Sequence, residues 1–150
     1  MSKKRVNLVN VQLVKESSAL YEGSVEKRAV LSPEDAVQLF RTFVQNPDRE
    51  YFVVICLDTK NQPTNFSVVS IGSLNKSIVH PREIFKVAIL SNSAKIITLH
   101  NHPSGDSTPS VQDKDITERL AEAGELLGIE LIDHVIVGDE PYSMKRHGDF

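Results

Sequence analysis

The spacing of apolar residues predicts three helices separated by strands. The helices cover residues 32–45, a segment that opens with residues 80–83, and residues 111–127. The first has a strong start, because Ser32 suits the N-cap position and Pro33 suits the first helical position. Gly128 follows the third helix where a left-handed residue commonly ends one. The core face predicted for the third helix consists of Ile116, Leu120, Ala123 and Leu127.

Runs of β-branched and aromatic residues predict the strands. They cover residues 6–14, 50–57, 64–71, 94–99 and 129–137, with a short last strand at 142–144. Residues 50–57 are typical of a buried central strand, and residues 64–71 return as its antiparallel hairpin partner, closed by residues 72–75. The order of elements predicts an α/β fold with a three-layer mixed β-sheet flanked by helices.

The first 31 residues are predicted to be a strand and an arm packed on the same domain as the rest. Residues 6–14 precede a loose polar segment, so we expect them at an edge of the sheet. Residues 15–28 have no clear period and suit an extended arm or a mobile loop. Residues 32–150 form the main body, and a chain of 150 residues suits a single domain overall.

Composition narrows the classes of function. Apolar residues make up 40% of the chain and charged residues 25%, the ordinary globular balance. The net charge of −3 gives no global basic field, which weakly disfavours DNA as the main partner. The single cysteine, Cys56, excludes an intramolecular disulfide and suits a buried, inert thiol. Neither a signal-peptide core nor an apolar stretch of membrane-spanning length is found, so we expect a cytoplasmic protein without membrane contact.

The candidate chemistry lies between His100 and Asp113, where an apolar strand leads into a helix start. His100 and His102 point the same way if strand geometry continues, with Cβ atoms roughly 6 to 7 Å apart. Both imidazoles could then reach one ion at about 2.0 to 2.1 Å, and Asp113 could supply a carboxylate. Three protein ligands leave one tetrahedral position open, as in catalytic zinc sites. The pattern predicts one zinc ion (Zn2+) per chain.

Each part of this stretch also has a simpler explanation. An isolated His-x-His commonly caps a turn or faces solvent, and Ser110 with Asp113 fits a capping box that needs no metal. Pro103, Gly105 and Pro109 are ordinary turn residues. Their joint occurrence, at a strand end that faces a helix start, favours the metal site.

The spacing of these residues resembles a known signature. His100-x-His102, seven residues, then Ser110-x-x-Asp113 is similar to the JAMM motif of the JAB/MPN metalloprotease superfamily. Members usually have Ser or Thr between the histidines, whereas this chain has Asn101, as RadC-like proteins commonly do. That difference leaves the three ligands intact.

The flanking residues resemble the RadC-like branch of the superfamily. The likeness runs from about Ser32 to the C-terminus, and it is carried by residues 80–85, 100–106 and 128–138. It implies a JAB/MPN domain, of the cytidine-deaminase-like fold, over residues 32–150. It also implies that the histidine pair and the aspartate are the ligands of a catalytic metal.

Catalytic roles for two further residues follow from the resemblance. Glu50 lies fifty residues before His100, in the place that corresponds to the superfamily's catalytic glutamate, and a carboxylate there could act as general base. Alternatively, Glu50 is a solvated residue at a strand start. Ser110 is implied as the donor to an oxyanion, with helix capping as its competing role. The other candidate bases are Glu34, Asp48 and Glu83.

Two classes of function remain open. The first is a zinc-dependent metallohydrolase, a peptidase or isopeptidase that hydrolyses an amide bond in a peptide or protein substrate. The second is a non-catalytic interaction module of the RadC type in DNA repair or replication, for which the sequence supplies no basic stripe. A zinc nucleobase deaminase is excluded, because its Pro-Cys-x-x-Cys ligands cannot come from one cysteine. The substrate and a homo-oligomeric state are left open.

His134 lies inside an apolar strand, which suits either a core histidine or a residue that contacts a metal ligand.

Overall fold

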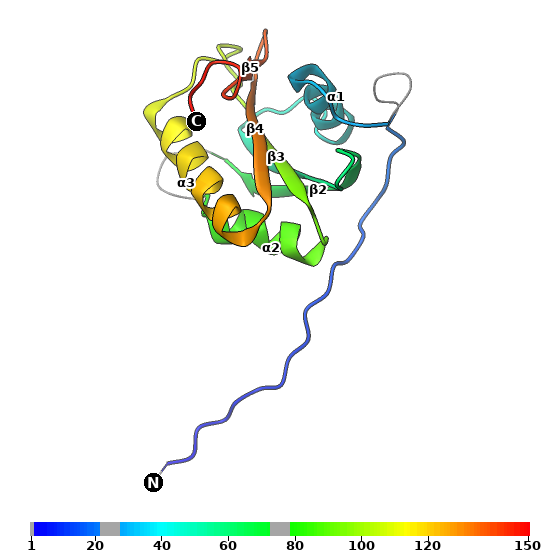
Figure 1. Ribbon diagram of the computed structural model, residues 1–150, viewed down its shortest axis with the longest axis vertical. Helices are drawn as coiled ribbons and strands as arrows, with labels where there is room; N and C mark the ends of the chain where they lie inside the picture. The colour runs from blue at the N-terminus through cyan, green and yellow to red at the C-terminus, as the bar shows by residue number, and fades with distance from the viewer. Residues whose placement is uncertain (1, 22–27, 73–78) are drawn as a thin grey trace.

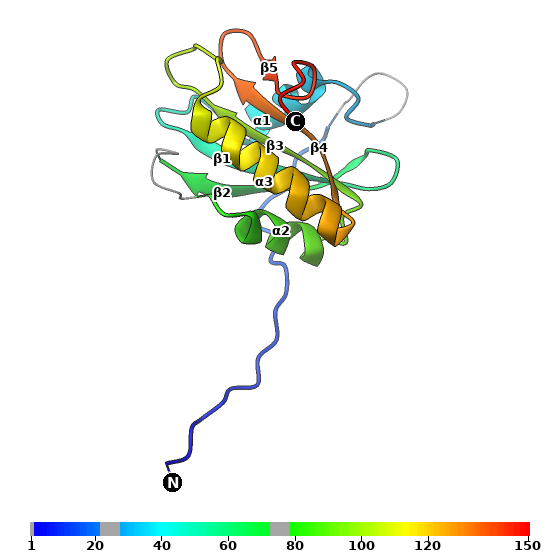
Figure 2. The ribbon, with the colours of Figure 1, turned by 60° about the vertical axis from the view of Figure 1, so that its left-hand side comes forward.

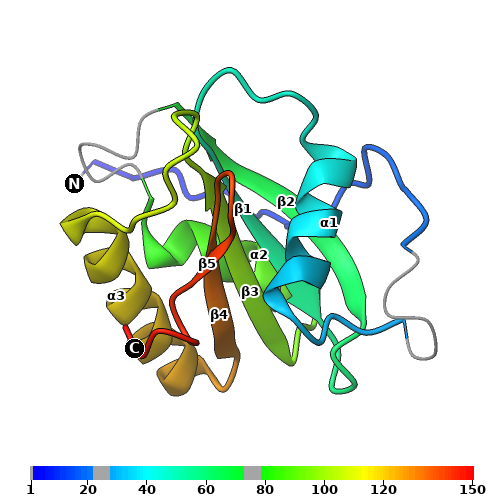
Figure 3. The same cartoon turned by 90° about the horizontal axis from the view of Figure 1, so that it is seen from above.

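The computed structural model describes residues 2–21, 28–72 and 79–150. Within them, five strands form one mixed sheet in the order β2-β1-β3-β4-β5. The elements are α1 (Pro33–Phe43), β1 (Tyr51–Leu57), β2 (Pro63–Ile71), α2 (Pro81–Leu90), β3 (Lys95–Asn101), α3 (Val111–Leu127), β4 (Glu130–Val137) and β5 (Tyr142–Ser143). Helix α1 covers one face of the sheet, and α2 and α3 cover the other (Figure 1, Figure 3). The predicted three-layer α/β fold is confirmed.

The strand pairing brings the candidate chemistry to one edge of the sheet. Strand β1 runs antiparallel to both β2 and β3. Strands β3 and β4 are parallel, and α3 connects them. Because parallel strands end at the same edge, the ends of β3 and β4 meet there, beside the beginning of α3 (Figure 2).

Alternate residues of the strands build a separate core on each face. The face under α1 packs Val53, Ile55 and Leu99 against Phe40. On the opposite face, which α2 and α3 cover, the core includes Phe52, Val54, Cys56 and Ile96 from the strands and Leu120 from α3. Cys56 is fully buried, and burial raises the pKa of its thiol, as suits the inert residue that the sequence predicts.

The buried face of α3 agrees in large part with the predicted one. Leu120 is buried as expected, and Ile116 and Ala123 are partly buried against the same core, but Leu127 is 46% exposed. The helix also buries Asp113, Thr117 and Gly124. A Cβ atom on Gly124 would collide with the Ile129 carbonyl oxygen, so a glycine lets the helix approach the start of β4. Apolar spacing alone did not reveal that a polar stripe faces the sheet.

The predicted strand over residues 6–14 is wrong. Residues 2–20 form no regular element and are exposed, and they run away from the domain as an extended arm (Figure 1). A strand needs a neighbour for its backbone hydrogen bonds, and none of the described strands pairs with this segment. The predicted packing of this arm therefore begins only at Tyr21, whose hydroxyl donates to the Ala29 carbonyl at 3.4 Å.

Parts of two other predicted segments lie outside the described residues. They are residues 22–27 of the predicted arm or loop and residues 73–75 of the predicted turn after β2. Among the residues that are described, no helix combines the length and the apolar character that crossing a bilayer requires.

Candidate metal centre

The structure brings His100, His102 and Asp113 together. His100 is near the end of β3, His102 directly follows that strand, and Asp113 lies in the first turn of α3. The Nε2 atoms of the two histidines are 3.0 Å apart, and Asp113 oxygens lie 3.2 Å from His100 Nε2 and 3.4 Å from His102 Nε2. Ligands at about 2.0 to 2.1 Å in a tetrahedron are separated by about 3.3 to 3.4 Å. The three side chains could therefore hold one tetrahedral metal ion.

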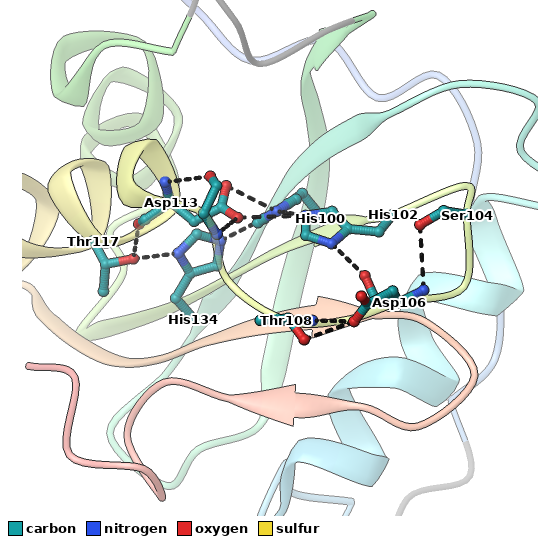
Figure 4. Close-up of polar contacts among 9 residues, drawn as sticks. His100, His102, Ser104, Asp106, Thr108, Asp113, Thr117 and His134 are labelled. Carbon is teal, nitrogen blue, oxygen red and sulfur yellow. Dashed lines mark hydrogen bonds and ion pairs between the residues drawn. The ribbon is translucent and has the colours of Figure 1, made fainter.

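A chain of hydrogen bonds sets the proton position on His100 (Figure 4). The Thr117 hydroxyl donates to the main-chain carbonyl of Asp113 at 2.6 Å, so its oxygen can only accept from His134 Nδ1, at 2.5 Å. Burial lowers the pKa of His134, which keeps that ring neutral and leaves its Nε2 without a proton. His100 Nδ1 must then donate to His134 Nε2, at 2.8 Å. The lone pair of His100 Nε2 consequently faces the cluster.

His102 reaches the same state through a simpler contact. Its Nδ1 lies 2.7 Å from the main-chain carbonyl oxygen of Asp106, which can only accept, so Nδ1 carries the proton. In a neutral ring the Nε2 lone pair then faces the cluster. Hydrogen bonding and charge from Asp113 raise the pKa of His102, so a proton competes with a metal ion for this nitrogen.

The loop that carries His102 is held against the end of β4. The His102 amide donates to the Val137 carbonyl at 2.9 Å, and the Asp139 amide donates to the Gly105 carbonyl at 2.8 Å. The two backbones approach so closely that a Cβ atom on Gly138 would collide with the Gly105 oxygen. Gly105 itself has a φ of +88°, a backbone conformation that residues other than glycine rarely adopt. These contacts fix a loop that would otherwise place one ligand loosely.

Asp113 belongs both to the candidate metal cluster and to the cap of α3. Its Oδ2 accepts from the Ser110 amide at 2.8 Å, and Ser110 Oγ accepts from the Asp113 amide at 3.1 Å. The capping box predicted as the simpler explanation is therefore present together with the cluster. Burial favours a higher pKa for Asp113, but when the two Nε2 atoms carry protons instead of a metal ion, hydrogen bonds from His100 and His102 outweigh burial and hold the pKa well below its usual range. The carboxylate is thus charged, as a metal ligand must be.

Glu50 lies on the same face of the sheet as the histidines. In the antiparallel β1–β3 pair, Phe52 is opposite His100. If this register continued past the strand ends, Glu50, two residues before Phe52, would face His102, two residues after His100. The half-buried Glu50 is also close enough for its charge to raise the pKa of His102.

The three other candidate bases are engaged elsewhere. Glu34 pairs with Arg146, Asp48 pairs with Arg49, and Glu83 pairs with Lys86, each at 2.9 Å. Glu50 is favoured over them as the candidate base because its charge acts on His102.

Ser110 keeps a proton to donate while it caps the helix. Its oxygen accepts from the Asp113 amide, and the exposed hydroxyl retains its own hydrogen. The predicted capping and oxyanion roles can therefore coexist in one side chain.

A groove beside α1 has His102 in its lining. Its walls come from α1, from the loop before β1 and from the end of β4, and its lining includes Phe40, Val44, Asn101 and Gly138. A neighbouring hollow along α1 shares Arg41 and Asp139 with it. His102 is the residue of the cluster that lines this groove.

Sequence reasoning anticipated His134 but missed Thr117 and Asn101. His134 is fully buried and contacts a ligand, as its place in an apolar strand suggested. Thr117 follows Asp113 by four residues and so shares its helix face, a signal that could have been used. Asn101 contacts residues that are about fifty positions away, which no local pattern shows.

Thr117→Val is expected to weaken metal binding by about 10- to 100-fold, the usual cost of losing an outer partner of a ligand. Valine keeps the shape but removes the oxygen that fixes the His134 proton on Nδ1. Competition with a chromophoric chelator measures the affinity. Thr117→Ser is the control, because it keeps the hydroxyl; equal losses in both variants would contradict the hydrogen-bond chain.

Comparisons with known proteins identify the family of this chain. A family model described as RadC-like JAB domain matches residues 30–149. A UPF0758 protein of Methanosarcina barkeri is 51% identical over 123 residues, which are 81% of this chain and 54% of that protein. One from Desulfitobacterium hafniense is 54% identical over 118 residues, 78% of this chain and 52% of the relative. The chain spans about half the length of these curated relatives.

Proposed function

The chain belongs to the family of RadC-like JAB domains, and we propose that it is a metal-dependent hydrolase that cleaves an amide bond in a peptide or protein. The observation that carries the proposal is the cluster of His100, His102 and Asp113, with separations that suit one tetrahedral ion. The hydrogen bonds that hold both Nδ1 protons leave two nitrogen lone pairs for that ion.

Zinc is the metal that this donor set fits best. Two imidazoles and one carboxylate are typical zinc ligands, and three protein ligands leave the fourth position open. A zinc ion held there would supply a water of lowered pKa and a positive charge for the substrate carbonyl oxygen.

The chain's own residues would move the protons and steady the developing charge. Glu50 would take a proton from the attacking water and pass it to the leaving nitrogen as the C–N bond breaks. The Ser110 hydroxyl would donate a hydrogen bond to the carbonyl oxygen as it becomes negative. The groove that has His102 in its lining would hold part of the peptide next to the cleaved bond.

Metal content together with hydrolysis tests the proposal. We expect purified protein to hold near one zinc per chain and to cleave members of a peptide library, with cleavage sites read by mass spectrometry. A chelator should abolish cleavage, and added zinc should restore it. A chain that takes up no zinc, or a zinc-loaded chain that leaves every peptide intact, would contradict the proposal. Salt-dependent DNA binding by such a chain would favour the interaction module instead.

A further inference from the structure

The side chain of Asn101 holds the peptides on both sides of Glu50. Its Oδ1 accepts from the Tyr51 amide at 2.8 Å, and its Nδ2 donates to the Arg49 carbonyl at 3.0 Å. Asn101 is only 4% exposed, so few water molecules could replace these contacts. One amide group thus spans the residue that we assign as the general base.

These contacts occur where the regular ladder stops. The β1–β3 pairs begin at Phe52 and His100, and Glu50 precedes the first residue of β1. A strand end without ladder bonds would fray, but here the Asn101 amide takes the place of the main-chain partner. On the other side, the Glu50 carbonyl accepts from the Gly72 amide at 2.8 Å. The backbone of Glu50 is therefore tethered from both neighbouring strands.

Asn101 is placed to do this because it lies between two ligands. Side chains alternate along a strand, so His100 and His102 point to the face that carries Asp113, and Asn101 points to the opposite face under α1. We propose that Asn101 is a positioning residue. Its amide fixes the backbone of Glu50 next to the end of β3, so the end of this strand positions both the two histidine ligands and the base. The inference rests on the proposed role of Glu50.

Asn101→Ser tests the inference, because a hydroxyl is too short to reach both peptides. In zinc-loaded protein we expect kcat to fall by about 10- to 100-fold, as it does when reacting groups are slightly misplaced, with zinc affinity little changed. The matched comparison is the same substitution in a Glu50→Gln background. There kcat should not fall further, because the proposed effect of Asn101 on kcat is exerted through Glu50. An equal loss in both backgrounds, or an unchanged kcat, would overturn the proposal.

Crystal structures of zinc-loaded wild type and Asn101→Ser give a readout that needs no substrate. We expect the Glu50 carboxylate to move or lose density in the variant while His100, His102 and Asp113 stay in place. A Glu50 carboxylate at the same position in both structures would overturn the positioning role. The two proposals fail separately: a wild type without hydrolysis counts against the hydrolase, whereas the position of Glu50 decides the role of Asn101.

Discussion

Glu50→Gln is expected to lower kcat for amide hydrolysis by about 10²- to 10⁴-fold, while zinc content stays near one per chain. Glutamine keeps the size of the side chain and can still form hydrogen bonds, but it cannot accept a proton at neutral pH. Glu50 is not among the three residues of the cluster, so its substitution should leave the ligands unchanged. Rate assays and elemental analysis on the same preparation measure both quantities.

Glu34→Gln is the matched control for this result. Glu34 carries the same group on an exposed part of α1, where it pairs with Arg146. It should retain wild-type activity, because a surface ion pair contributes about 0 to 1 kcal/mol to stability and nothing to the centre. A Glu50→Gln protein that holds zinc and keeps full activity would refute the assignment of the base.

Asp113→Asn is expected to cost more zinc affinity than the 10- to 100-fold that is typical for an outer partner of a ligand. An amide retains the shape of the carboxylate, and its oxygen can still accept from the Ser110 amide, so the cap of α3 should survive. The negative charge between two imidazoles is lost, however, and the charge is what binds the ion. Hydrolysis should disappear together with the metal. Calorimetric titration with zinc, beside circular dichroism to confirm the helix, measures the effect.

Asp115→Asn provides the comparison for that substitution. Asp115 lies two residues further along α3 and is exposed, so the same chemical change there should leave zinc affinity as in the wild type. If Asp113→Asn bound zinc as tightly as Asp115→Asn, the carboxylate could not be a ligand, and the cluster would be reduced to a capped helix beside two histidines.

Local signals in the sequence were sufficient for most of the fold. Ser32 and Pro33 marked the start of α1, and the range predicted for α3 matches the observed one. The same signals failed for residues 6–14, because β-propensity describes the residues and not the neighbouring strand that they need. The apolar part of the buried face of α3 was predicted, but its polar members Asp113 and Thr117 were not, because hydrophobic spacing does not encode them.

Those residues of the candidate centre that lie close together in the sequence could be predicted. The spacing of His100, His102 and Asp113 was sufficient to predict the cluster. What the spacing could not show is how protons and backbone are fixed around it. Thr117 and Asn101 act through contacts that depend on where other strands and helices lie.

If the centre binds zinc as we propose, the double use of Asp113 would link the amount of this protein in a cell to the supply of zinc. One carboxylate joins the beginning of α3 to the cluster, and α3 carries Leu120 into the core. Because a ligand that binds only the native state stabilises it, free zinc at 100 times the dissociation constant would contribute about 2.7 kcal/mol. Under zinc starvation the unliganded chains would unfold more often and be degraded faster. The steady-state amount of the protein would then fall, so the zinc supply would act on this domain through protein turnover.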